Sequence, residues 1–288
     1  MRIDDNWPED TRKLLPEGNY LITSLDRRYT YEALREFDFI ASCTTGIDHL
    51  ELRDKPLICL RDDPDFLRGI YATAEHTWAL ILALVRRIPW AFEDVKQDHW
   101  NREAWQGTEL RGKTLGIVGY GRVGQQVAEI AKAFGMKVIA SDLPSGRHDA
   151  PYRDHKVEFC ILETLLKNAD IVTVHVPLND ETRGMFGIEQ FKQMKKSAYF
   201  INTSRGAVVD EFELCAALTL GYLAGAAVDV VADEQGWNQH SFLGRYAREH
   251  NNLIISPHIS GNTAESRRKT QIFMATKIKE FIKRRCSI

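Results

Sequence analysis

Three ionisable residues of different types each come shortly after a strand-like segment in the second half of the chain: Arg205, Glu234 and His258. The carboxyl ends of parallel strands meet at one edge of a sheet, so residues that are distant in sequence can converge there. An arginine binds a carboxylate bidentately and polarises a carbonyl, while a histidine exchanges protons near neutral pH. A nearby glutamate stabilises the charged imidazole. This set suits hydride transfer coupled to proton transfer.

A glycine-rich segment upstream has the spacing of a dinucleotide loop. Gly119, Gly121 and Gly124 lie between the buried-strand pattern of residues 114–118 and the amphipathic pattern of residues 122–134. In this context the first glycine permits a tight turn and the second lets backbone amides approach a pyrophosphate. The third allows the helix to pack closely on the strand, and the helix N-terminus attracts the phosphates. We therefore expect dinucleotide binding.

An acidic residue follows at the distance that a ribose contact requires. The next strand-like segment, residues 137–141, ends at Asp142, which can accept hydrogen bonds from the adenosine ribose and would repel a 2′-phosphate. The alternative is a turn former ahead of Leu143-Pro144. With the glycines, Asp142 predicts NAD as the cofactor.

Alternating segments predict how these residues are positioned. Strands are expected at residues 20–23, 39–43, 57–60, 114–118, 137–141, 171–176, 198–202, 226–230 and 253–256. Helices are expected at residues 30–37, 72–87, 122–134, 161–167, 188–194, 211–220 and 266–285, with a surface connection at 88–112. The order predicts an α/β fold: a doubly wound parallel Rossmann domain at 82–262 and a smaller α/β substrate domain formed by 1–81 and 263–288.

Composition restricts the partners to small molecules. The 288 residues are 44% hydrophobic, and 38 basic against 40 acidic residues give a net charge of −2, which removes the case for a nucleic-acid or anionic-membrane binder. The start has no apolar signal segment, the longest apolar run is too short for a bilayer, and the five cysteines form no CxxC pair. We therefore expect a cytoplasmic protein. We expect no metal site, because His175 has no second ligand at metal spacing.

The segments CTTGIDHLE, TAEHTWALILALVRR, ELRGKTLGIVGYGRVG, HVPLNDETRGMF, INTSRGAVVDE, GAAVDV and SPHISGNTAES resemble the D-isomer-specific 2-hydroxyacid dehydrogenases. The resemblance runs from about residue 41 to residue 269. It implies an NAD-dependent oxidoreductase that transfers a hydride between NAD and C2 of a D-2-hydroxy or 2-keto acid. It also implies a flavodoxin-like substrate domain and a homodimer, which the apolar segment Thr73–Val85 favours too.

The resemblance implies a role for each matching residue. Arg205 holds the substrate carboxylate and carbonyl, His258 is the acid–base group and Glu234 is its partner. The loop of Thr44, Thr45 and Gly46 contacts the substrate carboxylate. Besides the glycines and Asp142, the cofactor contacts are Arg122, Val123, His175, Val176, Pro177, Thr182, Thr203, Ser204, Asp229, Ser260 and Gly261.

Two departures from the family pattern stand out. Gln235 follows Glu234 where the family usually has proline, so that loop can sit differently. Before Asn19 the family usually has an additional strand and helix, and here there is only a short polar leader, which predicts a truncated substrate domain.

Three alternatives stay open at this point. The first is a catalytically silent NAD-responsive regulator, and the second is a formate or phosphite dehydrogenase of the same fold. The third is a dehydrogenase of a phosphorylated hydroxy acid, for which Arg53, Arg61 and Arg68 are candidate phosphate ligands.

Overall fold

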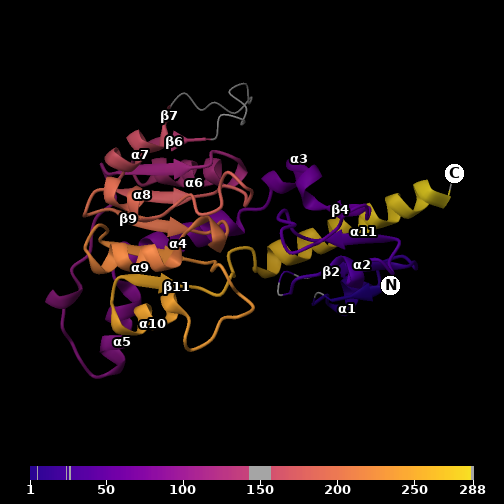
Figure 1. Ribbon diagram of the computed structural model, residues 1–288, viewed down its shortest axis with the longest axis horizontal. Helices are drawn as coiled ribbons and strands as arrows, with labels where there is room; N and C mark the ends of the chain where they lie inside the picture. Colours follow the sequence, from indigo (N-terminus) through magenta and orange to yellow (C-terminus); the bar gives the residue numbers. More distant parts are fainter. Residues whose placement is uncertain (5, 24, 26, 143–156, 287–288) are drawn as a thin grey trace. The chain divides into compact units, whose positions relative to one another are not determined.

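The structure, a computed structural model, describes residues 1–4, 6–23, 25, 27–142 and 157–286 (Figure 1). Its contacts separate two compact units, one formed by Met1–Ile70 with Gly261–Ile288 and the other by Tyr71–Ser260. The sequence placed the first division after residue 81. Helix α4 (Ala72–Val85) packs on α6, β9, β10 and β11, so all of it belongs to the second unit.

The described residues of the second unit form a seven-stranded sheet in the order β11-β10-β9-β8-β5-β6-β7, and all these strands are parallel. The strands are β5 (Thr114–Val118), β6 (Lys137–Ser141), β7 (Glu158–Phe159), β8 (Ile171–Val174), β9 (Tyr199–Asn202), β10 (Gly225–Val228) and β11 (Leu253–Ile255). The chain starts in the middle at β5, runs outward to β7 and then returns to build β8 to β11 on the other side. The predicted doubly wound α/β fold is confirmed.

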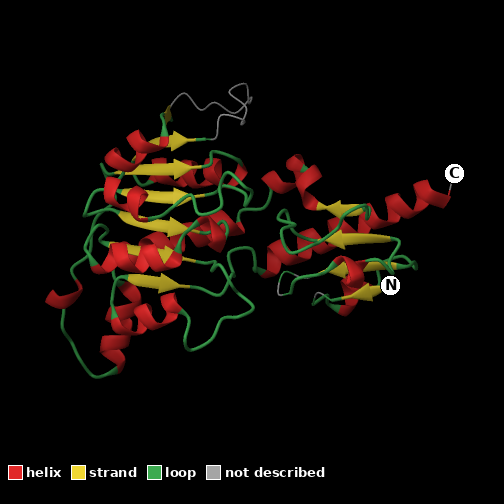
Figure 2. Cartoon of the chain, in the orientation of Figure 1, coloured by secondary structure: helices red, strands yellow, loops and turns green. Residues whose placement is uncertain are grey.

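Helices cover both faces of this sheet (Figure 2). On one face lie α4 and α6 (Arg122–Ala133), which bury Ile81 and Val127 against the sheet. On the other lie α7 (Leu162–Asn168), α8 (Ile188–Gln193), α9 (Glu211–Thr219) and α10 (Phe242–Glu249). Nearly continuous apolar strands such as Ile171–Val174 follow from burial on both faces.

The first unit has a four-stranded parallel sheet in the order β1-β2-β3-β4. Its elements are β1 (Arg2–Ile3), α1 (Glu9–Arg12), β2 (Tyr20–Thr23), α2 (Tyr31–Leu34), β3 (Phe39–Ser42), β4 (Leu57–Cys59), α3 (Pro64–Arg68) and α11 (Ala264–Cys286). Tyr20 stacks on Phe39, and Met274 and Ile278 of α11 are fully buried in the same core. The C-terminal helix therefore belongs to this unit.

The interpretation of the first residues as a mere polar leader is wrong. Arg2 and Ile3 pair with Leu21 and Ile22 to form an additional parallel strand, and α1 follows. The fully buried Trp7 anchors this stretch to the core. A two-residue strand is too short to show a periodic pattern, which explains why the sequence did not reveal it.

Other elements also differ from expectation. Residues 88–96 form helix α5 (Ile88–Lys96) where a surface connection was expected, and α10 was not anticipated. The apolar segment Thr73–Val85, which the sequence analysis took as favouring a partner subunit, buries Trp78, Ile81 and Leu84 within its own unit. Leu143 and Pro144, the turn alternative at Asp142, lie outside the described residues. In the part of the chain that is described, no helix is long and apolar enough to cross a membrane.

Candidate functional site

The turn after β9 places Arg205, and Asn202 closes that turn. The Asn202 Oδ1 accepts hydrogen bonds from the Ser204 backbone N–H at 3.0 Å and from its hydroxyl at 2.8 Å. Its Nδ2 donates to the Arg205 carbonyl oxygen at 2.9 Å, and the Arg205 guanidinium Nη1 donates to the Ser204 carbonyl oxygen at 2.8 Å. One buried amide thus determines the backbone that carries the guanidinium.

Gly206 brings the Arg205 turn against the segment that follows β10. A Cβ at Gly206 would lie 1.9 Å from the carbonyl carbon of Val231, so only glycine permits this approach. The Glu211 carboxylate accepts a hydrogen bond from the Ala232 N–H at 2.5 Å from the same side. The segments that carry Arg205 and Glu234 are therefore held backbone to backbone.

Glu234 and His258 form a direct pair. The Glu234 Oε2 lies 2.9 Å from the His258 Nδ1, and the two side chains are 35% and 21% exposed. The loop that begins at Glu234 is a tight turn, in which Asp233 Oδ1 accepts the Gly236 N–H at 2.9 Å. Gln235 in place of the family's proline therefore leaves the contact between Glu234 and His258 in place.

The backbone of His258 has an uncommon conformation. Its φ is +53°, in the left-handed region that residues with a Cβ rarely adopt. Its N–H donates to the Asp229 carbonyl oxygen at 2.7 Å. The next two amides donate to the Asp229 carboxylate, Ile259 N to Oδ1 at 3.0 Å and Ser260 N to Oδ2 at 2.9 Å. Asp229 thus holds the whole turn that carries the imidazole.

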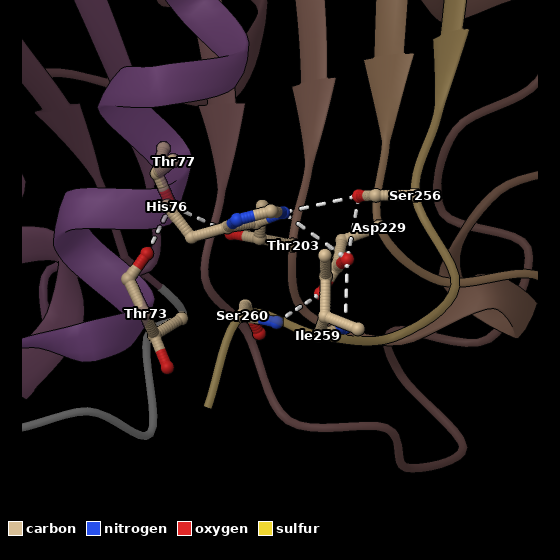
Figure 3. A network of polar contacts seen from close by, with 8 residues as sticks. All are labelled: Thr73, His76, Thr77, Thr203, Asp229, Ser256, Ile259 and Ser260. Carbon is tan, nitrogen blue, oxygen red and sulfur yellow. Dashed lines mark hydrogen bonds and ion pairs between the residues drawn. The ribbon is translucent and has the colours of Figure 1, made fainter. Parts of the chain in front are cut away.

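Two more residues, neither of which was predicted from the sequence as a site residue, complete the surroundings of Asp229 (Figure 3). Ser256 Oγ donates to Asp229 Oδ1 at 2.6 Å, and His76 Nε2 of α4 lies 3.0 Å from Ser256 Oγ and 3.2 Å from Asp229 Oδ1. Burial alone raises the pKa of the Asp229 carboxyl, but these hydrogen bonds outweigh it and hold the pKa below its usual range. The available signal for His76 was a histidine within an apolar helical segment.

The glycine loop has the geometry that its spacing predicted. Gly119 has φ +91°, and a Cβ there would lie 2.8 Å from the carbonyl carbon of His175. A Cβ on Gly124 would lie 2.3 Å from the Gly119 carbonyl oxygen, so the helix packs directly on the turn. Gly121 differs, because nothing lies within 4 Å of the place where its Cβ would be. The loop therefore leaves open space at the N-terminus of α6.

The other predicted cofactor residues lie after the strands of the second unit, except Gly261, with which the C-terminal part of the first unit begins. Asp142 is exposed directly after β6, and Arg122 and Val123 begin α6. Buried side chains follow the ends of the neighbouring strands: Val176, Thr182, Thr203, Ser204, Asp229 and Ser260. The Thr182 hydroxyl donates to the Pro177 carbonyl oxygen at 2.6 Å, and Thr203 Oγ1 lies 2.9 Å from Thr77 Oγ1.

His175 is a neutral residue in this arrangement. Desolvation lowers the pKa of its imidazole to about 3. Its Nε2 lies 2.9 Å from the Thr173 hydroxyl. Among the described residues no cluster of three or more histidine, cysteine, aspartate or glutamate side chains could hold a metal ion.

The predicted substrate loop lies in the first unit. Thr44 Oγ1 donates to the Gly46 carbonyl oxygen at 2.7 Å and lies 2.8 Å from the Ser42 hydroxyl. Arg61 Nε donates to the Thr45 carbonyl oxygen at 3.2 Å. These hydrogen bonds hold the loop, which directly follows β3, in one conformation.

Known proteins resemble this chain over most of its length. The family model described as D-isomer specific 2-hydroxyacid dehydrogenase, NAD binding domain, matches residues 78–260. A glyoxylate reductase from Aeropyrum pernix is 37% identical, over 92% of this chain and 80% of its own. A D-3-phosphoglycerate dehydrogenase from Bacillus subtilis is 39% identical over 88% of this chain but only 47% of its own.

A solved structure of a 2-hydroxyacid dehydrogenase has the same fold as this chain. The D-lactate dehydrogenase from Aquifex aeolicus, complexed with NAD and lactic acid, superposes with a TM-score of 0.80 at 29% identity. The alignment covers 98% of this chain and 87% of that one. Both units of the chain thus have counterparts in a single known protein.

Proposed function

Because the chain belongs to the D-isomer specific 2-hydroxyacid dehydrogenase family and is an NAD-dependent oxidoreductase of CH–OH groups, we propose that its substrate is a short 2-keto acid. The class is that of glyoxylate and hydroxypyruvate, after which two of its relatives are named. The observation that carries the proposed chemistry is the 2.9 Å contact between Glu234 and His258 on a turn that Asp229 holds. A regulator has no need of an acid–base pair held in this way.

The three ionisable residues divide the work. Arg205 binds the substrate carboxylate and polarises the adjacent carbonyl, because a guanidinium offers paired donors and a permanent charge. His258 engages Glu234 through Nδ1, so Nε2 is the atom that gives its proton to the carbonyl oxygen during reduction. Glu234 fixes the orientation of the imidazole ring through its contact with Nδ1. In the reverse direction His258 accepts the hydroxyl proton.

The nicotinamide cofactor, when bound, supplies or accepts the hydride at C2 of the substrate. The residues present fit it, because Gly121 leaves open space at the N-terminus of α6 and Gly119 adopts the positive φ that the turn needs. We assign to Asp142, which is exposed directly after β6, the role of accepting the ribose hydroxyls. We assign the remaining contacts to Arg122, Val123, His175, Val176, Pro177, Thr182, Thr203, Ser204, Asp229, Ser260 and Gly261.

A phosphorylated substrate is the second candidate, and Arg61 is the observation in its favour. Arg61 contacts the Thr45 carbonyl of the proposed substrate loop. The other two candidate arginines have local partners, since Arg53 lies over the Tyr31 ring at 4.3 Å and Arg68 pairs with Asp65 at 3.0 Å.

We propose that Thr44, Thr45 and Gly46 contribute backbone groups to the substrate carboxylate.

A substrate panel tests the proposal. Steady-state rates with NADH are measured for glyoxylate, hydroxypyruvate and longer 2-keto acids, and with NAD for lactate and 3-phosphoglycerate. The short keto acids should have the highest kcat/KM. Replacing His258 or Arg205 by alanine should lower kcat/KM by about 10²-fold or more. Turnover that survives both substitutions would refute the assigned chemistry, and a preference for 3-phosphoglycerate would favour the phosphorylated substrate.

We also propose a homodimer in the cytoplasm. Helix α5 and the segment after it expose Ile88, Phe92, Val95 and Trp100, which a second copy of the chain could cover. The described cysteines Cys43, Cys59, Cys160 and Cys215 are free thiols, which suits a reducing compartment. Light scattering should give twice the mass of the chain, and Phe92→Glu should yield a monomer.

A further inference from the structure

His76 contacts Asp229, the residue that holds the turn of the proposed acid–base residue. The hydrogen bonds around Ser256 show that the Nε2 of His76 is a donor. The single hydroxyl proton of Ser256 points to Asp229 Oδ1 at 2.6 Å. The Ser256 oxygen can therefore only accept from His76 Nε2, 3.0 Å away, so that nitrogen carries a proton. The same N–H also faces Asp229 Oδ1 at 3.2 Å.

Asp229 needs these donors because its side chain is fully buried. A buried carboxylate is stable only where hydrogen bonds replace its hydration. Its four donors are His76, Ser256 and the amides of Ile259 and Ser260, which come from α4 and from the chain that follows β11 (Figure 3). Since Ile259 and Ser260 directly follow His258, the position of the Asp229 carboxylate determines the turn that carries the imidazole.

This turn requires support from its surroundings. A non-glycine residue at φ +53° is in a sparsely populated conformation, which persists only where neighbouring contacts determine it. His258 has such contacts through Asp229, whose carbonyl oxygen accepts its N–H and whose carboxylate accepts the next two amides. The direction of the imidazole toward Glu234 follows from this backbone.

We propose that His76 is a positioning residue for the acid–base group. It donates to Ser256 and Asp229, keeps the carboxylate where the 258–260 turn needs it, and so holds His258 against Glu234. This inference rests on the proposed role of His258. The contacts of His76 are with Ser256 and Asp229, so its effect reaches the reaction through the conformation of the turn.

The test compares two substitutions that differ in their donors. His76→Leu removes the N–H, whereas His76→Gln keeps an amide N–H of similar reach. Expected is a fall in kcat for keto-acid reduction of about tenfold or more in His76→Leu, with the KM for the keto acid changed much less. His76→Gln should recover most of that loss. A matched control is His250→Leu, because His250 stacks on Tyr246 before β11 and has no contact with this network.

Hydrogen exchange provides a readout that does not depend on turnover. Amide exchange at Ile259 and Ser260 should be faster in His76→Leu than in the wild type, and near the wild-type rate in His76→Gln. Unchanged exchange in His76→Leu would overturn the inference, as would a Gln variant as slow in catalysis as the Leu variant. A kcat that stays at the wild-type value although exchange rises would overturn it equally.

The two proposals can fail separately. A wild-type protein without keto-acid turnover contradicts the proposed function, and the exchange rates still decide whether His76 holds the turn. A wild-type protein with turnover and an insensitive His76→Leu variant contradicts the inference alone. As a further check, a variant that combines His76→Leu with Ser256→Ala is measured. Its fall in kcat should be smaller than the product of the two single falls, because both substitutions act on Asp229. Independent effects would place His76 outside the network.

Discussion

The Nδ1 of His258 and the Oε2 of Glu234 lie 2.9 Å apart, although these residues are 24 positions apart in sequence. The segment before Glu234 is held where Gly206 packs against Val231. The turn at 258–260 is held by the Asp229 carboxylate. In the proposed chemistry this contact orients the imidazole ring, so that Nε2 is left to exchange a proton with the substrate.

Replacing the carboxylate should therefore slow the reaction. Glu234→Gln keeps a side chain of the same length but removes the negative charge that faces the ring, so kcat for keto-acid reduction should fall by about tenfold or more, with a much smaller change in the KM. The rates are measured at saturating NADH. Glu249→Gln, at an exposed carboxylate on α10, serves as the control. An unchanged kcat in Glu234→Gln would show that the pair does not work as a unit.

The glycine loop permits a sharp comparison between two alanine substitutions. Gly121→Ala places a methyl in open space, so the folded protein should keep its Tm while the KM for NADH rises at least tenfold. Gly124→Ala places its methyl 2.3 Å from a backbone carbonyl oxygen and should lower the Tm by several degrees. Thermal unfolding and NADH titration separate the two effects. A Gly121→Ala variant that binds NADH normally would contradict the assigned pyrophosphate position.

Asp142 should determine the choice between the two nicotinamide cofactors. The wild type should prefer NADH, because a carboxylate at the end of β6 repels a 2′-phosphate. In Asp142→Ala the ratio of kcat/KM for NADH to that for NADPH should fall by about tenfold or more, since one charge repulsion and one ribose acceptor are lost together. Glu163→Ala, an exposed acidic residue on α7, should leave the ratio unchanged. Better wild-type rates with NADPH would refute the prediction.

The desolvated imidazole of His175, a partly buried side chain, should make stability depend on pH. Desolvation lowers the pKa of this group from 6.5 to about 3, so below pH 6.5 the unfolded chain takes up a proton that the folded chain does not. The free energy of unfolding must therefore fall as the pH falls from about 6.5 toward 3, by about 1.4 kcal/mol per pH unit for this group.

Denaturant unfolding of His175→Asn between pH 7 and pH 4.5 measures this contribution. The variant should have a shallower pH dependence than the wild type, because the difference between the two proteins cancels the other titrating groups. His240→Asn, at an exposed histidine, is the control. Equal slopes in the wild type and His175→Asn would mean that the imidazole is protonated in the folded protein.

Local sequence patterns were sufficient for the family, the NAD cofactor and the doubly wound fold, all of which are confirmed. The reason is that a glycine turn, a buried strand and a helix start are properties of adjacent residues. The boundary of the second unit could not be predicted in this way, because helix α4 packs on strands more than a hundred residues downstream. Trp7 shows the same limit, since its burial depends on β2, β3 and α11.

The sequence by itself thus determined the reaction class and identified Arg205, Glu234 and His258 as its candidate residues, because their types and their places after strands carry that chemistry. Only the tertiary structure decided how these residues are held. The contact between His76 and Ser256 joins positions 180 residues apart, and the missing side chain of Gly206 is what admits the Val231 backbone. Such contacts depend on how helices and strands pack against each other, and packing between distant segments leaves no periodic signal in the chain.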